Sequence, residues 1–167
     1  MATRWTIAVR GVAALAGAFA LSGVPTAWAE TPDRFEFSSS NPGTVDCGTF
    51  EDQFTDFVDA VGTVYFDQSG EPVRIVIHWE HHSNDTNSVT GLTLHEHGHF
   101  TETIDLLSGT DTITGSEEVM NRPGTGVVVQ DVGKVVYDAD GNLVFFAGGR
   151  NHSEVLLGDE VLCAALA

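Results

Sequence analysis

Residues 72–82 of the chain read PVRIVIHWEHH, and this stretch decides the fold class. Its apolar and polar residues alternate, which is typical of a strand with one buried and one exposed face. The apolar positions are Val73, Ile75, Ile77 and Trp79; the polar positions are Arg74, His78, Glu80 and His82. We therefore expect a β-strand with a polar face made largely of histidine and glutamate.

Similar patterns extend outward from this strand in both directions. Apolar, β-branched and aromatic residues recur in several further segments, and turn-forming residues separate them; the segments are 56–66, 91–105, 112–120, 127–137 and 143–147. Residues 83–88 are polar and rich in asparagine, and we expect a loop there. Six or seven short strands predict an all-β protein, either a small antiparallel β-barrel or, alternatively, a β-sandwich.

The N-terminus has the features of a secretory signal peptide. Arg4 and Arg10 precede or begin an apolar run over residues 11–23, and Ala27-Trp28-Ala29 supplies a small-x-small cleavage site. An uncleaved anchor is the alternative, but the run is short for a membrane-spanning helix. We expect a signal peptide over residues 1–29, an extended lead-in over 30–45, and one β-barrel domain over 46–167, in a secreted protein.

The chain is strongly acidic, with 7 basic and 24 acidic residues and a net charge of −17. Removing residues 1–29 deletes two arginines and no acid, which leaves 5 basic residues and a net charge of −19. Such a surface repels nucleic acid and anionic lipid. We expect neither as a partner of the mature protein.

The two cysteines, Cys47 and Cys163, lie near opposite ends of the mature chain. An even number of cysteines in an exported protein indicates a disulfide. A metal-binding or catalytic thiol pair is the alternative, but the C-x-x-C spacing is absent. We expect a structural disulfide that holds the first strand beside the last segment and so closes the sheet.

The C-terminal third also resembles a known group of proteins. Residues 123–149 read PGTGVVVQDVGKVVYDADGNLVFFAGG, and residues 162–166 read LCAAL. This pattern, together with the cysteine positions, resembles small exported bacterial proteins without an assigned activity. The resemblance implies a compact β-barrel of the allene-oxide-cyclase-like or lipocalin-like kind.

One segment matches a catalytic motif. His95-Glu96-His97-Gly98-His99 satisfies H-E-x-x-H, which in zinc proteases lies on a helix that places both histidines on one face. The flanking residues are β-branched and aromatic, and Gly98 disfavours a helix. A zinc-dependent hydrolase that uses His95, Glu96 and His99 is therefore an alternative hypothesis, and the leading expectation is a protein without catalytic activity.

As a strand, the same segment suggests a metal site. We expect His95, His97 and His99 on the polar face. If this strand pairs with the strand over residues 72–82, one register that keeps the apolar faces together sets them opposite His82, Glu80 and His78 respectively. Imidazole and carboxylate ligands suit zinc or copper. A solvated polar face is the competing interpretation. The candidate ligands are His78, Glu80, His82, His95, His97 and His99.

For the function we expect a structural role or the binding of a small apolar ligand in the barrel interior. Aromatic side chains are numerous enough to line a pocket or to fill a core. The candidates are Phe57, Tyr65, Phe66, Trp79, Phe100, Phe145 and Phe146.

Overall fold

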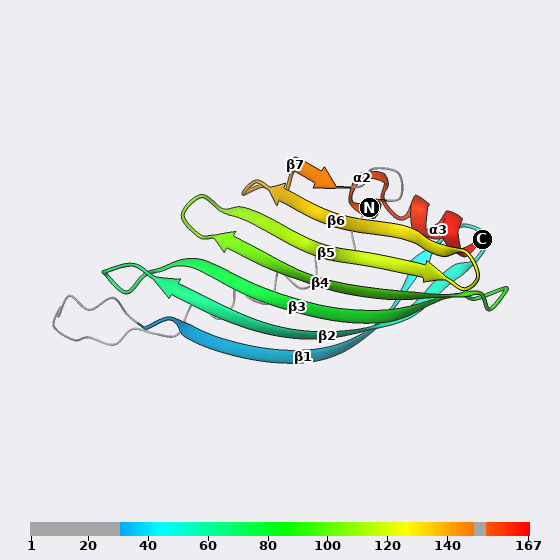
Figure 1. Ribbon diagram of the computed structural model, residues 1–167, viewed down its shortest axis with the longest axis horizontal. Coiled ribbons are helices and arrows are strands. Elements are labelled where there is room, and N and C mark those ends of the chain that lie inside the picture. The colour runs from blue at the N-terminus through cyan, green and yellow to red at the C-terminus, as the bar shows by residue number, and fades with distance from the viewer. Residues whose placement is uncertain (1–30, 149–152) are drawn as a thin grey trace.

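The computed structural model describes residues 31–148 and 153–167; the predicted signal peptide lies outside them. The fold is one antiparallel sheet of seven strands, in which each strand pairs with the next along the chain (Figure 1). The strands are β1 (Asp33–Asp46), β2 (Glu51–Phe66), β3 (Pro72–Asn87), β4 (Thr93–Asp105), β5 (Thr110–Arg122), β6 (Gly126–Tyr137) and β7 (Leu143–Gly148). The prediction of a mostly β fold with antiparallel pairing is confirmed.

Aspartates open three of the connecting turns. Asp67 follows β2, Asp105 is the last residue of β4, and Asp138 follows β6. The side chain of each accepts backbone N–H groups from the turn that it begins. Hydrogen bonds of this kind are why aspartate favours turns. The pKa of each carboxyl group lies below its usual range. The main cause is a hydrogen bond from the Ser69 side chain for Asp67, from the Ser108 backbone for Asp105 and from the Asn142 side chain for Asp138. These turns fix where neighbouring strands reverse direction.

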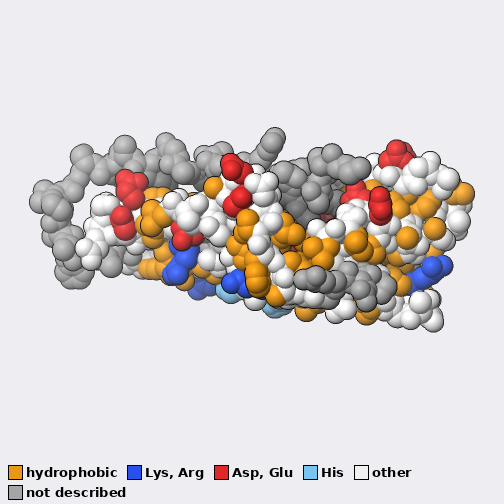
Figure 2. Space-filling view, turned by 90° about the horizontal axis from the view of Figure 1, so that it is seen from above, with side chains coloured by type: hydrophobic (Ala, Val, Ile, Leu, Met, Phe, Trp, Pro, Cys, Tyr) orange, Lys and Arg blue, Asp and Glu red, His pale blue; other side chains and the backbone are white. Residues whose placement is uncertain are grey.

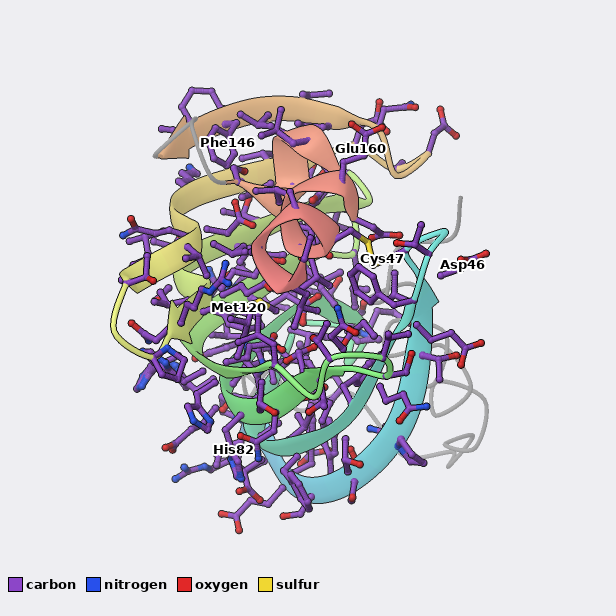
Figure 3. The ribbon with its side chains drawn as sticks, turned by 90° about the vertical axis from the view of Figure 1, so that its right-hand side faces the viewer. Asp46, Cys47, His82, Met120, Phe146 and Glu160 are labelled. Atoms are coloured by element: carbon purple, nitrogen blue, oxygen red, sulfur yellow. A yellow bond between two sulfur atoms is a disulfide. The ribbon has the colours of Figure 1, made fainter. Side chains whose placement is uncertain are left out.

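The sheet curls strongly but does not close, so the expectation of a closed barrel is corrected. Strands β1 and β7 are the two edges of the sheet, and they do not pair with each other. Strand β7 has only 6 residues against 14 in β1, and the later part of the chain forms helices instead of another strand. Viewed along the strands, the sheet forms an open curve with a helix at its mouth (Figure 3).

The predicted extended lead-in is a full strand of the sheet. Strand β1 pairs with β2 over its whole length, from Asp33 opposite Val64 to Asp46 opposite Glu51. Its sequence is rich in serine and includes Pro42, and both features argue against a strand when the sequence is taken alone. An edge strand tolerates proline because one of its sides has no ladder to complete.

The C-terminal segment contains two short helices, α2 (Glu154–Leu157) and α3 (Glu160–Leu166). Leu162 and Leu166 of α3 are fully buried in a core with Leu94, Met120 and Val129. No helix in the described residues is long and apolar enough to span a membrane. Helix α3 thus caps one end of the curved sheet from its inner side.

The predicted disulfide between Cys47 and Cys163 is present. It does not join two strands, however. Cys47 lies in the turn between β1 and β2, and Cys163 lies in α3 (Figure 3). The bond therefore fastens the helix to one edge of the open sheet, and the expectation that it closes the sheet is corrected.

A row of glycines lets the sheet bend across β5, β6 and β7. Gly115 pairs with Gly133, which in turn pairs with Gly148. Gly133 has a φ of 144°, and a Cβ there would overlap the carbonyl group of Ala147. Glycine is favoured at such bends because only it tolerates both the dihedral angle and the close approach.

Candidate functional site

The predicted polar face exists and lies on the outer side of the curved sheet. All six candidate ligands are exposed there, on β3 and β4: His78, Glu80, His82, His95, His97 and His99. Figure 3 shows His82 projecting away from α3 and the interior. The two strands do bring their polar faces together, as expected from the alternation.

The pairing differs from the predicted register by two residues. His82 lies opposite His97, Glu80 opposite His99, and His78 opposite Thr101. The reason is that residues 83–87 belong to β3, so the predicted loop is wrong. The turn begins at Asn87, whose side-chain oxygen accepts the backbone N–H groups of Val89 and Thr90 at 2.8 and 2.9 Å.

The H-E-x-x-H segment forms part of strand β4. His95 and His99 point outward, whereas Glu96 points inward and is buried. A zinc protease needs both histidines and the glutamate on one side of a helix. The strand separates them, so these residues do not form that site.

A histidine that the sequence analysis did not single out occupies the inner face. His81 is 2% exposed, and its Nε2 lies 2.7 Å from the backbone oxygen of Glu117. Its Nδ1 lies 3.5 Å from Asp56 Oδ1 and 3.6 Å from Glu96 Oε1. The ring lies across Gly98, where any Cβ would overlap it. Gly98 is therefore required by the close approach of His81.

The hydrogen-bond direction of the His81 ring follows from its partner. A carbonyl oxygen only accepts, so Nε2 of His81 carries a hydrogen and donates it to the backbone oxygen of Glu117. Nδ1, on the other side of the ring, faces the carboxyl groups of Asp56 and Glu96. The three side chains form a buried polar cluster on the inner face.

A second buried acidic group contacts the tryptophan of the core. Trp79 Nε1 donates to Glu102 Oε2 at 2.8 Å, and Glu102 in turn shares a hydrogen bond with Asp111. Burial raises the pKa of Glu102 to about 7, with the Asp111 carboxylate adding to the rise. Burial also raises the pKa of Asp111. Both carboxyl groups therefore bind protons more tightly than they would in solvent.

The pKa of Glu117 is raised further than that of Glu102. Burial raises its pKa to about 8; the nearby Asp131 adds to the rise and His81 opposes it. Its Oε2 is buried without a hydrogen-bond partner. Asp131 accepts the backbone N–H of Glu154 at 2.9 Å, although burial still raises its pKa. Protonation removes the cost of a buried, unpaired charge.

The other part of the inner face is apolar and aromatic. Trp79 lies between two phenylalanines: the Phe37 ring meets it edge-on at 5.4 Å between centroids, and the Phe100 ring stacks at 6.0 Å. Trp79 and Phe100 are buried, whereas Phe37 is 38% exposed. This group, which we call the Trp79 aromatic row, faces the open concave side from the β1 edge.

The predicted aromatic candidates divide between the two faces. Trp79 and Phe100 belong to the buried core, but Phe57 stacks on His82 on the outer face. Tyr65 lies beneath the Arg74 guanidinium, and Phe145 is 49% exposed on β7. One small hollow among the described residues encloses about 170 Å³, open space included, with Glu117, Asp131 and Phe146 in its lining.

The buried polar residues of β3 could have been predicted in part by continuing the two-residue alternation beyond Trp79. The apolar positions of β3 end at Trp79, but every second residue continues inward as His81, Ser83, Asp85 and Asn87. Because these buried residues are polar, a search for alternating apolar residues does not detect this part of the strand. The partners Asp56, Glu102 and Glu117 come from other strands, and only the register brings them together.

No protein-family model, curated protein or solved structure matches this chain. Among the described residues, no three histidine, cysteine, aspartate or glutamate side chains already converge so as to hold a metal ion.

Proposed function

We propose that the mature protein is exported and binds a small apolar ligand, without catalysing a reaction, at the open side of its curved sheet. The single observation that carries the proposal is the Trp79 aromatic row. Phe37 is exposed on the edge strand β1 while it contacts a buried tryptophan. A flat apolar molecule could extend this row by covering Phe37, which water otherwise contacts.

The exposure of Phe37 indicates where the ligand would lie. Phe37 is 38% exposed on the edge strand, whereas Trp79 and Phe100 are buried. The ligand would therefore lie along the concave surface at the Phe37 edge. A purely structural role, as in a filled lipocalin-like or allene-oxide-cyclase-like scaffold, is the alternative.

Export is supported by the N-terminal pattern and by the disulfide, which is typical of oxidising compartments. The proposal predicts cleavage after Ala29 and a secreted chain that begins at Glu30. Intact-mass measurement of the protein recovered from the culture medium tests this. A secreted or cell-bound species that retains residues 1–29 would contradict it.

The ligand proposal can be tested with one intrinsic reporter. Trp5 and Trp28 fall in the signal peptide, so Trp79 is the sole tryptophan after cleavage. The probe is N-phenyl-1-naphthylamine, a neutral apolar fluorophore that accepts energy from tryptophan. We expect saturable quenching of Trp79 and a matching rise in probe emission, and a long-chain fatty alcohol should displace the probe.

Two phenylalanine variants provide a matched comparison. Phe37→Ala should weaken probe binding at least fivefold, because it removes the exposed member of the row. Phe57→Ala removes a ring of similar exposure, 42% against 38%, from the outer face, and should leave binding unchanged. Equal effects of the two variants, or no saturable quenching, would leave the structural role as the better account.

A further inference from the structure

The register of β3 and β4 assembles four potential metal ligands on the outer face. His82 lies opposite His97, and the next outward-facing pair is Glu80 opposite His99. The four side chains form a two-by-two block, with His82 and Glu80 on one strand and His97 and His99 on the other. This block lies on the side of the sheet away from the Trp79 aromatic row and does not depend on the proposed ligand.

The spacing of such a block suits one ion. Directly opposed side chains have Cβ atoms about 4.5–5.5 Å apart, and diagonal neighbours lie roughly 7–8 Å apart. Imidazole nitrogens bind Zn²⁺ at about 2.0–2.1 Å, and three nitrogens with one carboxylate oxygen complete a tetrahedral set. Imidazole ligands also suit Cu²⁺, which binds more tightly than Zn²⁺ to most sites.

The neighbouring strand β2 contributes a negative charge and an aromatic ring beside the block. Asp59 lies opposite Glu80 on the neighbouring strand β2 and adds negative charge. The Phe57 ring stacks on His82 at 5.1 Å with an interplanar angle of 12°, which restricts that imidazole. His82 thus lies on the side of the block next to β2, and Phe57 covers one face of its ring.

The two remaining histidines of this face have other partners. His78 Nδ1 lies 3.0 Å from Thr101 Oγ1, and His95 Nδ1 lies 2.6 Å from Asn84 Oδ1. Neither lies opposite another histidine or glutamate on the paired strand. They flank the block along the strands and serve as controls of the same residue type.

We propose that Glu80, His82, His97 and His99 bind one Zn²⁺ or Cu²⁺ ion on the outer face of the sheet. Among the described residues no such set of side chains yet converges, so binding requires rotation of these four. All four are exposed, and exposed side chains change rotamer within nanoseconds. The backbone already supplies the spacing, and the ion draws the side chains together.

The test uses the mature, disulfide-bonded protein without a histidine tag. Calorimetric titration with ZnCl₂, and separately with CuCl₂, should give one ion per chain. Co²⁺ should give the intense visible absorption of a tetrahedral site. His97→Ala should weaken Zn²⁺ binding at least tenfold, and His97→Ala with His99→Ala should abolish it. His78→Ala and His95→Ala should each change the affinity by less than threefold.

Far-ultraviolet circular dichroism and Trp79 emission check that every variant is folded. The proposal is overturned if the wild-type protein binds no ion, or if the flanking variants weaken binding as much as His97→Ala. Binding that survives in the double variant also overturns it and points to another location, such as His81 with Asp56 and Glu96. Loss in the block variants alone supports it.

Discussion

Gly98 illustrates how a single residue is fixed by a contact that its own strand does not reveal. The His81 ring crosses it from β3, and the backbone oxygen of Glu117 approaches it from β5. A side chain here would overlap both. The glycine that disfavours a helix over the H-E-x-x-H segment is needed for the packing of a buried imidazole.

Gly98→Ala should therefore destabilise the protein strongly. Overpacking in a core typically costs 1–3 kcal/mol, and we expect about 3 kcal/mol because one of the opposing atoms belongs to the backbone. Chemical denaturation followed by Trp79 emission measures it.

Gly91→Ala is the control for Gly98→Ala. Gly91 has a φ of 72°, but nothing lies within 4 Å of an added Cβ. Its substitution should cost only the backbone strain, about 1 kcal/mol. Equal losses in the two variants would show that the His81 ring does not need the space.

Among the elements, α3 depends on three kinds of contact. The disulfide attaches it at Cys163, Asn87 Nδ2 donates to the Leu166 oxygen at 3.0 Å, and Leu162 and Leu166 are fully buried. A helix of 7 residues has too few internal hydrogen bonds to persist alone. Packing against the inner face of the sheet is therefore what holds it.

Leu166→Ala should destabilise the protein by about 2–4 kcal/mol, since it empties a fully buried position. Leu157→Ala, on the neighbouring helix α2, should cost less than about 0.5 kcal/mol because that side chain is 49% exposed. Thermal unfolding of both variants with the disulfide intact makes the comparison. Similar losses would mean that α3 is held by the disulfide rather than by packing.

The elements also show what alternation can and cannot predict. The strand class, the outward face of β3 and β4 and the disulfide follow from local pattern and cysteine count. The two-residue error in register arose because Ser83, Asp85 and Asn87 are buried polar residues, which resemble a loop in sequence. Strand β1 was missed for a related reason, since its pairing with β2 outweighs its low strand propensity. Whether the sheet closes depends on how its two edge strands lie relative to each other, and no single stretch of the sequence predicts this.

On the scale of the whole molecule, the two edges of the sheet differ in character. Strand β1 contains Pro42 and is largely polar, features that discourage pairing with other chains. Strand β7 exposes Leu143, Val144 and Phe145. It lies uppermost in Figure 1, and the view from above in Figure 2 shows hydrophobic side chains exposed on that side. The net charge of −17 of the chain opposes association through this edge.

The acidic interior makes the whole molecule sensitive to pH. Glu102 and Glu117 have their pKa values raised to about 7 and about 8, from an ordinary value of 4.5. The folded protein therefore keeps protons that the unfolded chain releases, and its free energy of unfolding falls as pH rises. This stabilisation is fully present below about pH 4.5 and is lost as the pH passes through 7 to 8.

The thermal midpoint should accordingly be higher at pH 5.5 than at pH 8.5. For Glu117 alone, a pKa raised from 4.5 to about 8 lowers the free energy of unfolding by about 3 kcal/mol between these two pH values, at 1.36 kcal/mol per pH unit, or roughly 10 °C. Glu117→Gln cannot ionise, so it should reduce the difference between the two midpoints mainly by raising the one at pH 8.5. Glu36→Gln, on the exposed surface of β1, should leave the difference unchanged. A midpoint that stays constant or rises with pH would contradict this. It would show that these carboxyl groups are already ionised in the folded protein at pH 5.5, so that unfolding releases no protons from them.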